Sequence, residues 1–149
     1  MQCSAPYCNN AQIVVVPVVK KDQYSSLEGI QSLRFAVEHG SAGNEQATKY
    51  GFKVVEVQDQ ASALMEVASG TADAAIIDSL MAAAMVGPGT GYEALTYTVA
   101  LNAEEYGVGF RKGSDLAYML NAFLEAGYDD GSIMKIAEKY GVQAALITK

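Results

Sequence analysis

Residues 70–86 read GTADAAIIDSLMAAAMV, and this stretch contains the pattern on which the fold depends. Gly70 lies where a preceding helix should end, and the apolar run 74–77 is typical of a buried strand. Ser79 is then expected to be the N-cap of an apolar helix over residues 80–86. A buried strand between two helices in so short a stretch is the repeating unit of an α/β fold.

The segments on both sides continue this alternation. The run QIVVVPVV over 12–19 is rich in β-branched residues, which indicates a first buried strand. We expect further strands over 33–37, 53–57, 94–99 and 106–110. We expect helices over 44–50, 114–126 and 132–140, and one that opens at residue 59 or 60, with glycine stops at 51, 70, 127 and 141. The order of these elements predicts a three-layer αβα sandwich around a mostly parallel sheet.

The composition excludes several classes of function. The 149 residues are 50% hydrophobic, which is enough for one globular domain with a buried core. The 17 acidic and 10 basic residues give a net charge of -7, and the basic residues are scattered, so we expect no nucleic-acid partner. The longest apolar stretch, 80–92, is interrupted by glycines and a proline and is too short to cross a bilayer. The first residues lack the basic and apolar regions of a secretory signal, so none is expected in this chain.

Candidate catalytic and metal-binding residues are few. The chain has one histidine, His39, and its two cysteines, Cys3 and Cys8, are five residues apart, a spacing that makes no zinc site. A local disulfide and two free thiols are both compatible with this spacing. Glu104 and Glu105 are neighbours in an extended segment, so their side chains should point to opposite faces. We therefore expect no catalytic residue, no metal and no cofactor, and we do not expect an enzyme.

Binding residues are expected where strands end, because ligands of open α/β sheets bind beyond the carboxyl ends of the strands. In the loop over 38–43, Gly40, Ser41 and Ala42 let the backbone approach a ligand and offer N–H groups and a hydroxyl to an anion at a helix N-terminus. No phosphate-loop motif is present, which favours a carboxylate as that anion. Asp78 ends another strand, and its charge suits an ammonium group. If the two loops lie together, they would hold both ends of a free α-amino acid.

Each of these signals also has an ordinary structural explanation. Glycines at 40 and 43 are common in plain strand-to-helix turns, and Asp78 suits a helix N-cap as well as a ligand contact. His39, with no nucleophile nearby in the sequence, is expected to be a solvated loop residue. These alternatives stay open at the level of the sequence.

Five segments share their order and spacing with a known family. They are SAPY at 4–7 with NAQ at 10–12, LEG at 27–29 with FAVEHGS at 35–41, AL at 63–64 with GTADAAIID at 70–78, YGVGFRKGS at 106–114, and the final helix to KY at 139–140. These segments resemble the solute-binding proteins of amino-acid ABC transporters, which have the bilobed type II periplasmic-binding fold. The final KY is a departure, because the family usually has Lys-Trp there.

The resemblance implies roles for particular residues. Gly40, Ser41 and Ala42 match the positions where the family receives the α-carboxylate of the ligand, and Asp78 matches the position that receives the α-ammonium. Glu38 matches a position whose side chain often faces the ligand, and an acid there would favour a cationic or hydrogen-bonding side chain. The implied function is the binding of an amino acid for delivery to an ABC permease. Such a protein is extracellular or periplasmic, and membrane-associated at full length.

The resemblance also implies a division of the chain. Residues 1–149 would be a single truncated unit, in which 8–104 form the second lobe of a solute-binding protein. Residues 105–149 would form a return strand and C-terminal helices that pack on a first lobe absent from this chain. An apolar stripe would then need cover, and it comprises Leu116, Met119, Leu120, Phe123 and Leu124. The helices could fold onto the second lobe or be buried mutually by two chains, and of these we expect a homodimer through the helices. A dehydratase-like enzyme and a ligand-sensing domain are alternatives on the same fold.

Overall fold

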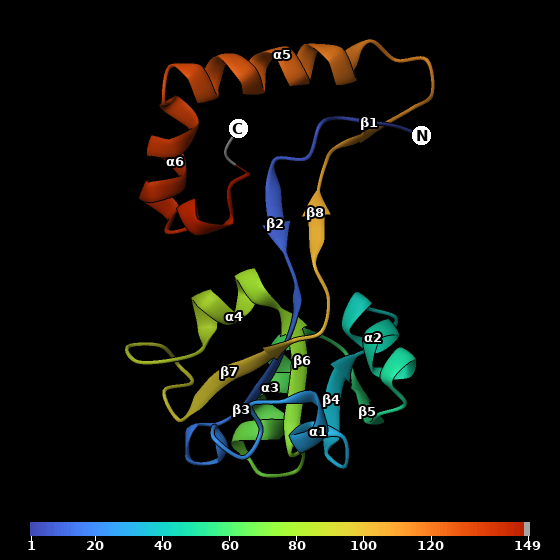
Figure 1. The fold of residues 1–149 in the computed structure, drawn as a ribbon, viewed down its shortest axis with the longest axis vertical. Coiled ribbons are helices and arrows are strands. Elements are labelled where there is room, and N and C mark those ends of the chain that lie inside the picture. The colour runs from blue at the N-terminus through green and yellow to red at the C-terminus, as the bar shows by residue number, and fades with distance from the viewer. Residues whose placement is uncertain (148–149) are drawn as a thin grey trace. The chain divides into compact units, whose positions relative to one another are not determined.

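The computed structural model describes residues 1–147, which form two compact units (Figure 1). Unit 2 is the continuous segment Ala11–Ala103, and unit 1 combines Met1–Asn10 with the residues from Glu104 onward. The chain therefore enters unit 2 once and leaves it once. None of the described helices is both long and apolar enough to cross a membrane.

Unit 2 is built on a five-stranded sheet with the strand order β5-β4-β6-β3-β7. The strands are β3 (Gln12–Pro17), β4 (Arg34–Glu38), β5 (Lys53–Val57), β6 (Ala74–Asp78) and β7 (Leu95–Ala100). β4 pairs in parallel with β5 and β6, whereas β3 runs antiparallel to its neighbours β6 and β7. Four strands of this sheet thus point the same way, which confirms the mostly parallel arrangement, and β3 is reversed.

The first predicted strand, over 12–19, is two residues too long. β3 ends at Pro17, and a short 3-10 helix, η1 (Val18–Lys20), follows it. Proline has no backbone N–H to continue a strand ladder, so the apolar run leaves the sheet at this point.

Helices cover both faces of the sheet, as the prediction of a three-layer sandwich requires (Figure 1). α1 (Leu27–Ile30) and α2 (Ala42–Tyr50) contribute to one core cluster, and α3 (Gln60–Ala68) and α4 (Ser79–Met85) contribute to the other. Successive strand residues point to opposite faces, so neighbours in one strand belong to different clusters. The first cluster includes Val14, Phe35 and Ile76, and the second includes Val15, Ala36 and Ile77.

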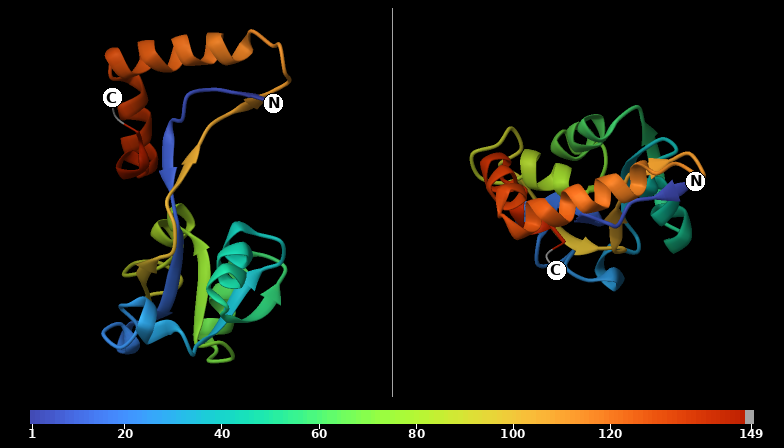
Figure 2. Two further views of the ribbon diagram at one scale, coloured as in Figure 1. Left: turned by 45° about the vertical axis from the view of Figure 1, so that its right-hand side comes forward. Right: turned by 90° about the horizontal axis from the view of Figure 1, so that it is seen from above.

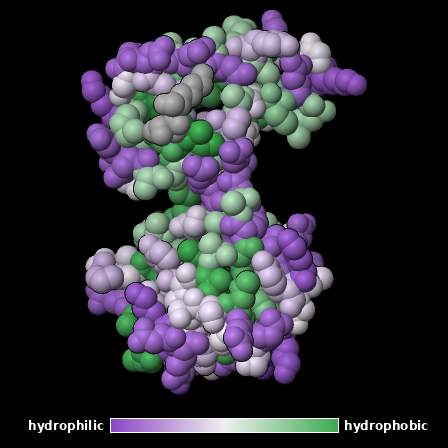
Figure 3. Space-filling view, in the orientation of Figure 1, coloured by the Kyte–Doolittle hydropathy of each residue, from purple (hydrophilic) through white to green (hydrophobic). Residues whose placement is uncertain are grey.

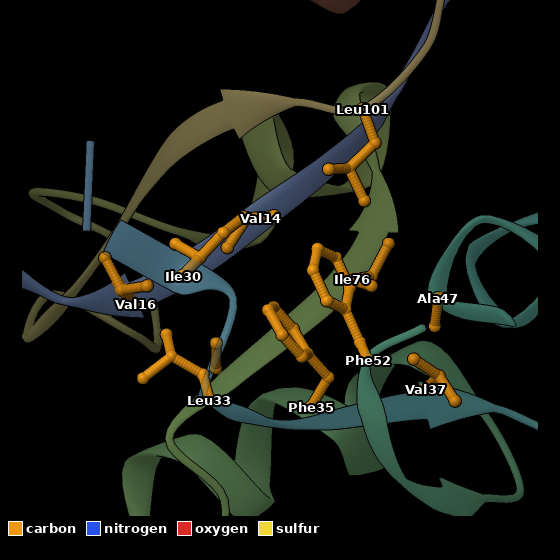
Figure 4. Packing of buried hydrophobic residues seen from close by; sticks show 11 residues of the cluster. Val14, Val16, Ile30, Leu33, Phe35, Val37, Ala47, Phe52, Ile76 and Leu101 are labelled. Atoms are coloured by element: carbon orange, nitrogen blue, oxygen red, sulfur yellow. The ribbon is translucent and has the colours of Figure 1, made fainter. Parts of the chain in front are cut away.

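The first cluster is closely packed (Figure 4). The rings of Phe35 and Phe52 stack with their centroids 4.5 Å apart. Ile30 from α1 and Ile76 from β6 are also almost completely buried. Burying each such side chain stabilises the fold by about 1.5–3 kcal/mol, so these apolar contacts hold the sheet and its helices together.

Unit 1 contains two short antiparallel ribbons (Figure 2). β1 (Gln2–Cys3) pairs with β9 (Gly109–Phe110), and β2 (Cys8–Asn10) pairs with β8 (Glu104–Tyr106). The prediction of one strand over 106–110 is therefore wrong. Pro6 lies between β1 and β2 and has no N–H to donate to a strand ladder, so the pairing is interrupted there. Nearby, the N–H of Val108 donates to the Ser4 hydroxyl at 2.9 Å. Cys3 and Cys8 are both free thiols.

Two helices complete unit 1, α5 (Leu116–Asp129) and α6 (Ser132–Tyr140), and the 3-10 helix η2 (Gln143–Ala145) follows them. α6 ends before Gly141, which has a φ of 70°, as predicted. Gly127 does not end α5, contrary to the prediction. A Cβ on this buried glycine would lie 2.8 Å from Cδ1 of Ile133, so the glycine is needed for close packing of the two helices.

The predicted apolar stripe on α5 is largely exposed. Leu116, Met119 and Phe123 are 50%, 61% and 70% exposed, whereas Leu120 and Leu124 are partly buried. In Figure 3 the surface over α5 shows pale green, apolar residues beside purple, hydrophilic ones. Residues 148 and 149 of the predicted C-terminal segment lie outside the described residues.

Candidate functional site

The carboxyl ends of β4, β5 and β6 lie at one edge of the sheet in unit 2, because these three strands are parallel neighbours. Each strand leads into a helix: β4 into α2, β5 into α3 and β6 into α4. The N-termini of these three helices, which are the positive ends of their dipoles, therefore lie at the edge where the strands end. The residues predicted for the site lie at this edge, in the loop that follows β4 or at the first position of α2; they are Glu38, Gly40, Ser41, Ala42 and Asp78.

Ser41 is the N-cap of α2, and its Oγ accepts a hydrogen bond from the backbone N–H of Asn44 at 3.1 Å. This bond uses a lone pair and leaves the hydroxyl proton for another acceptor. The helix starts at Ala42 and not at residue 44 as predicted, because the Ser41 cap allows the small residues to enter the first turn. The first-turn N–H groups of Ala42 and Gly43 have no acceptor within the helix, so they can meet an anion.

Gly43 brings the N-terminus of α2 close to β6. A Cβ at this position would lie 3.0 Å from the carbonyl oxygen of Ile76 and 3.2 Å from Oε1 of Gln12. A Cβ here would be in tight contact with these atoms, so they would have to move by a few tenths of an ångström. Gly40 has a φ of 69°, in the left-handed region, which turns the chain from β4 into the helix.

Asp78 ends β6 and is partly buried. Its Oδ1 accepts a hydrogen bond from Nε2 of Gln12, and its Oδ2 accepts one from Nε2 of Gln60, each at 2.7 Å. The backbone N–H of Asp78 donates to Oε1 of Gln60 at 2.9 Å. Two neutral amides thus fix the direction of a carboxylate at the end of the strand.

The prediction that Ser79 caps α4 is wrong. The helix begins at Ser79, and Asp78 occupies the N-cap position without a side-chain cap hydrogen bond. Oγ of Ser79 accepts instead from the backbone N–H of Ala11 at 3.2 Å. Asp78 thus occupies the N-cap position that the alternative interpretation gives it, but its side chain makes no cap hydrogen bond.

Gln12 links the two predicted loops. Its side chain is buried, at 2% exposure, with Oε1 against the first turn of α2 at Gly43 and Nε2 on Asp78. The residues around Ser41 and the Asp78 carboxylate therefore lie on opposite sides of one carboxamide. Sequence reasoning missed both Gln12 and Gln60. The available signal was a polar residue at the start of an otherwise apolar strand, and another at the start of a helix.

Glu38 is partly buried at the end of β4, and a small polar cluster lies beside it. Nδ1 of His39 lies 2.7 Å from Oε2 of Glu56, and Nδ2 of Asn44 donates to Oε1 of Glu56 at 2.7 Å. The contact with His39, and then that with Asn44, lower the pKa of the Glu56 carboxyl. This cluster fastens the loop before α2 to β5, and His39 is exposed as predicted.

An open hollow of about 500 Å³ lies at the same edge, lined by His39, Glu56, Val57 and Gln58. Over the residues that the structure describes, no group of three or more metal-ligating side chains is brought together. The arrangement at the edge thus offers hydrogen-bond donors from a helix N-terminus and a carboxylate of fixed direction.

Known proteins share this fold and part of this sequence. No family model matches the chain. It is 30% identical over 130 residues to the arginine-binding extracellular protein ArtP of Bacillus subtilis (strain 168), an alignment that covers 83% of this chain and 51% of ArtP. A mutant of ArgBP from T. maritima matches with a TM-score of 0.79 at 30% identity, covering 93% of this chain and 60% of ArgBP.

A third match is the ancestral amino acid-binding protein AncCDT-1, a precursor of cyclohexadienyl dehydratase. Its TM-score is 0.78 at 28% identity, and the match covers 93% of this chain and 60% of AncCDT-1. The chain thus spans about half to three fifths of the length of these proteins. In its fold, and in part of its sequence, the chain is similar to amino-acid-binding proteins with the type II periplasmic-binding fold.

Proposed function

We propose that this chain binds a free amino acid at the strand-end edge of unit 2. The first turn of α2, with Gly40, Ser41 and Ala42, receives the α-carboxylate, and Asp78 receives the α-ammonium. The observation that carries this proposal is the position of Gln12, whose carboxamide lies against Gly43 on one side and bonds Asp78 on the other. The helix end offers hydrogen-bond donors that suit the α-carboxylate of an amino acid, and the Asp78 carboxylate suits its α-ammonium. The Gln12 side chain lies between the two.

A cationic amino acid such as arginine is the ligand class that we favour. Glu38 adds a partly buried acid to the same edge, close in sequence to the loop that would hold the α-carboxylate. An acid there suits a positively charged ligand side chain. The relatives support the choice, because ArtP is named as an arginine-binding protein.

We place this binding in solute transport. ArtP is an extracellular protein, and the described helices include none that could cross a membrane. The chain would act outside the cell or in the periplasm as the substrate-binding part of an ABC transporter, presenting the amino acid to a permease. Unit 2 would correspond to the second lobe predicted over 8–104.

Calorimetric titration of the 149-residue chain with L-arginine tests the proposal. Asp78→Ala should weaken binding about tenfold or more, because it removes a charge-assisted hydrogen bond. The matched control is Asp73→Ala at the opposite end of the same strand, where Oδ2 of Asp73 accepts from the N–H of Arg34 at 2.9 Å. Equal affinities of Asp78→Ala and the unaltered chain would contradict the assignment of the ammonium site.

One observation favours a second candidate function. AncCDT-1, which matches nearly the whole chain, is a precursor of a dehydratase. A dehydratase-like reaction is therefore worth an assay with prephenate and arogenate as substrates. Turnover of either compound would replace the binding-only function with an enzymatic one.

A further inference from the structure

Gln60 makes contacts with Asp78 that a helix-forming residue at this position does not need. It is the first residue of α3, and the cap of that helix is supplied by Asp59, whose Oδ1 accepts from the N–H of Ser62 at 2.7 Å. The side chain of Gln60 is therefore not used for capping. It points instead to the end of β6, where both of its polar atoms bond Asp78.

The two bonds fix different parts of Asp78. Oε1 of Gln60 accepts from the backbone N–H at 2.9 Å, which holds the end of the strand, and Nε2 donates to Oδ2 at 2.7 Å, which holds the carboxylate. A single carboxamide thus restrains both the main chain and the side-chain torsions of one residue. Gln12 adds one bond to the other carboxylate oxygen, from a strand that is already in register with Asp78.

The chemistry of these donors suits a site that must remain charged. A lysine or arginine at either position would pair with the carboxylate and cancel its attraction for a ligand cation. Amides orient the carboxylate and carry no charge, so they leave its negative charge in place.

We propose that Gln60 is a positioning residue, which fixes the Asp78 carboxylate in the direction needed for the α-ammonium of the ligand. This inference rests on the proposed function, since it assumes that Asp78 meets the ammonium. It predicts that a change at Gln60 weakens binding only of ligands that carry the α-ammonium group, although Gln60 itself does not contact the ligand.

The test compares two ligands on the full 149-residue chain. Gln60→Met keeps the size of the side chain and removes both hydrogen bonds. It should weaken binding of L-arginine about tenfold, and weaken binding of the deaminated analogue 5-guanidinopentanoate by less than about twofold. The control is Gln31→Met, which removes an exposed carboxamide that bonds the carbonyl oxygen of Tyr50 at 3.1 Å. Equal losses for the two ligands would overturn the proposal, because a merely structural role affects both.

A second measurement does not depend on the ligand. In Gln60→Met, hydrogen exchange at the backbone N–H of Asp78 should accelerate, while in Gln31→Met it should not change. Unaltered exchange in Gln60→Met would show that Gln60 does not hold Asp78, and would also overturn the proposal. Absence of any amino-acid binding by the unaltered chain would contradict the proposed function, and the exchange data would still decide whether Gln60 fixes Asp78.

Discussion

The two units of this chain bury their apolar residues in opposite ways. In unit 2, large side chains such as Phe35, Ile76 and Leu64 are almost completely buried in two clusters, one on each face of the sheet. In α5 and α6 of unit 1, the fully buried residues are the small ones, Ala117, Gly127 and Ala137. Many of the large side chains of these helices are exposed, among them Tyr118, Met119, Phe123, Ile136 and Tyr140, and the others are only partly buried.

This difference shows what an amphipathic pattern can and cannot predict. The spacing of apolar residues predicts a helix and identifies its apolar face. It does not predict which other part of the protein covers that face. In unit 2 the sheet supplies the cover. In unit 1 the ribbons are two and three residues long and leave most of the helical surface exposed. Four predictions test the contrast.

The largest expected effect is on the free energy of unfolding. Phe35→Ala in unit 2 should lower it by about 3–5 kcal/mol, because a buried ring is replaced by a cavity. Phe123→Ala in unit 1 should change it by less than about 0.5 kcal/mol, because its ring is already exposed. Urea unfolding followed by far-UV circular dichroism measures both values. Similar losses in the two variants would show that Phe123 is also part of a core.

Glycine-to-alanine substitutions compare the packing of the two units by adding a single methyl group to each. Gly43→Ala should cost about 1–3 kcal/mol of unfolding free energy, because the new Cβ meets the backbone carbonyl of Ile76, which cannot move independently. Gly127→Ala should cost less although its Cβ would lie closer, 2.8 Å from Cδ1 of Ile133, since this atom is the end of a flexible side chain that can turn aside. Gly91→Ala, with open space around it, is the control. A larger loss for Gly127→Ala would contradict the looser packing of unit 1.

Self-association tests the predicted homodimer. If two copies cover their exposed helices mutually, the double variant Met119→Ser with Phe123→Ser should raise the dissociation constant about tenfold, equivalent to about 1.4 kcal/mol. Sedimentation equilibrium over a range of concentrations measures this constant. Tyr97→Ser, which changes an exposed aromatic residue of unit 2, is the control. A chain that stays monomeric at high concentration would exclude the homodimer.

The smallest effect concerns the polar cluster at the site. The contacts with His39 and Asn44 lower the pKa of Glu56 from its ordinary value of 4.5. A lowered pKa in the folded state means that the ionised form stabilises the fold above pH 4.5, and that this contribution is lost as the pH falls below it. Glu56→Gln should therefore flatten the dependence of the melting temperature on pH in this acid range. If the melting temperatures of the variant and of the unaltered chain change with pH in the same way, the cluster has no such role.

The parts of the fold that depend on local signals were predictable from the sequence. The strand over 53–57 and the helix over 132–140 were predicted with the bounds that the structure has, because β-branched runs and the glycine after a helix act within a few residues. The errors occur where tertiary contacts decide. Gly127 remains helical because Ile133 packs on it, and Ser79 bonds Ala11 instead of capping its own helix.

The candidate site divides in the same way. Asp78 and the residues near Ser41 were proposed because strand ends followed by small or acidic residues can be located in a sequence. Gln12 and Gln60 were missed because their roles depend on which strands become neighbours and on where the start of α3 lies. Their types and positions alone carry no sign of a shared contact with Asp78.

Unit 2 is one continuous segment, and this affects how the chain folds during translation. All of its residues, Ala11–Ala103, are synthesised before Glu104 emerges, so its sheet can form while the chain is still growing. The first strands of unit 1 have to wait, since Ser4 finds its partner Val108 only 104 residues later. Residues 1–10 therefore stay without their ribbon partners until residues 104–110 have been synthesised.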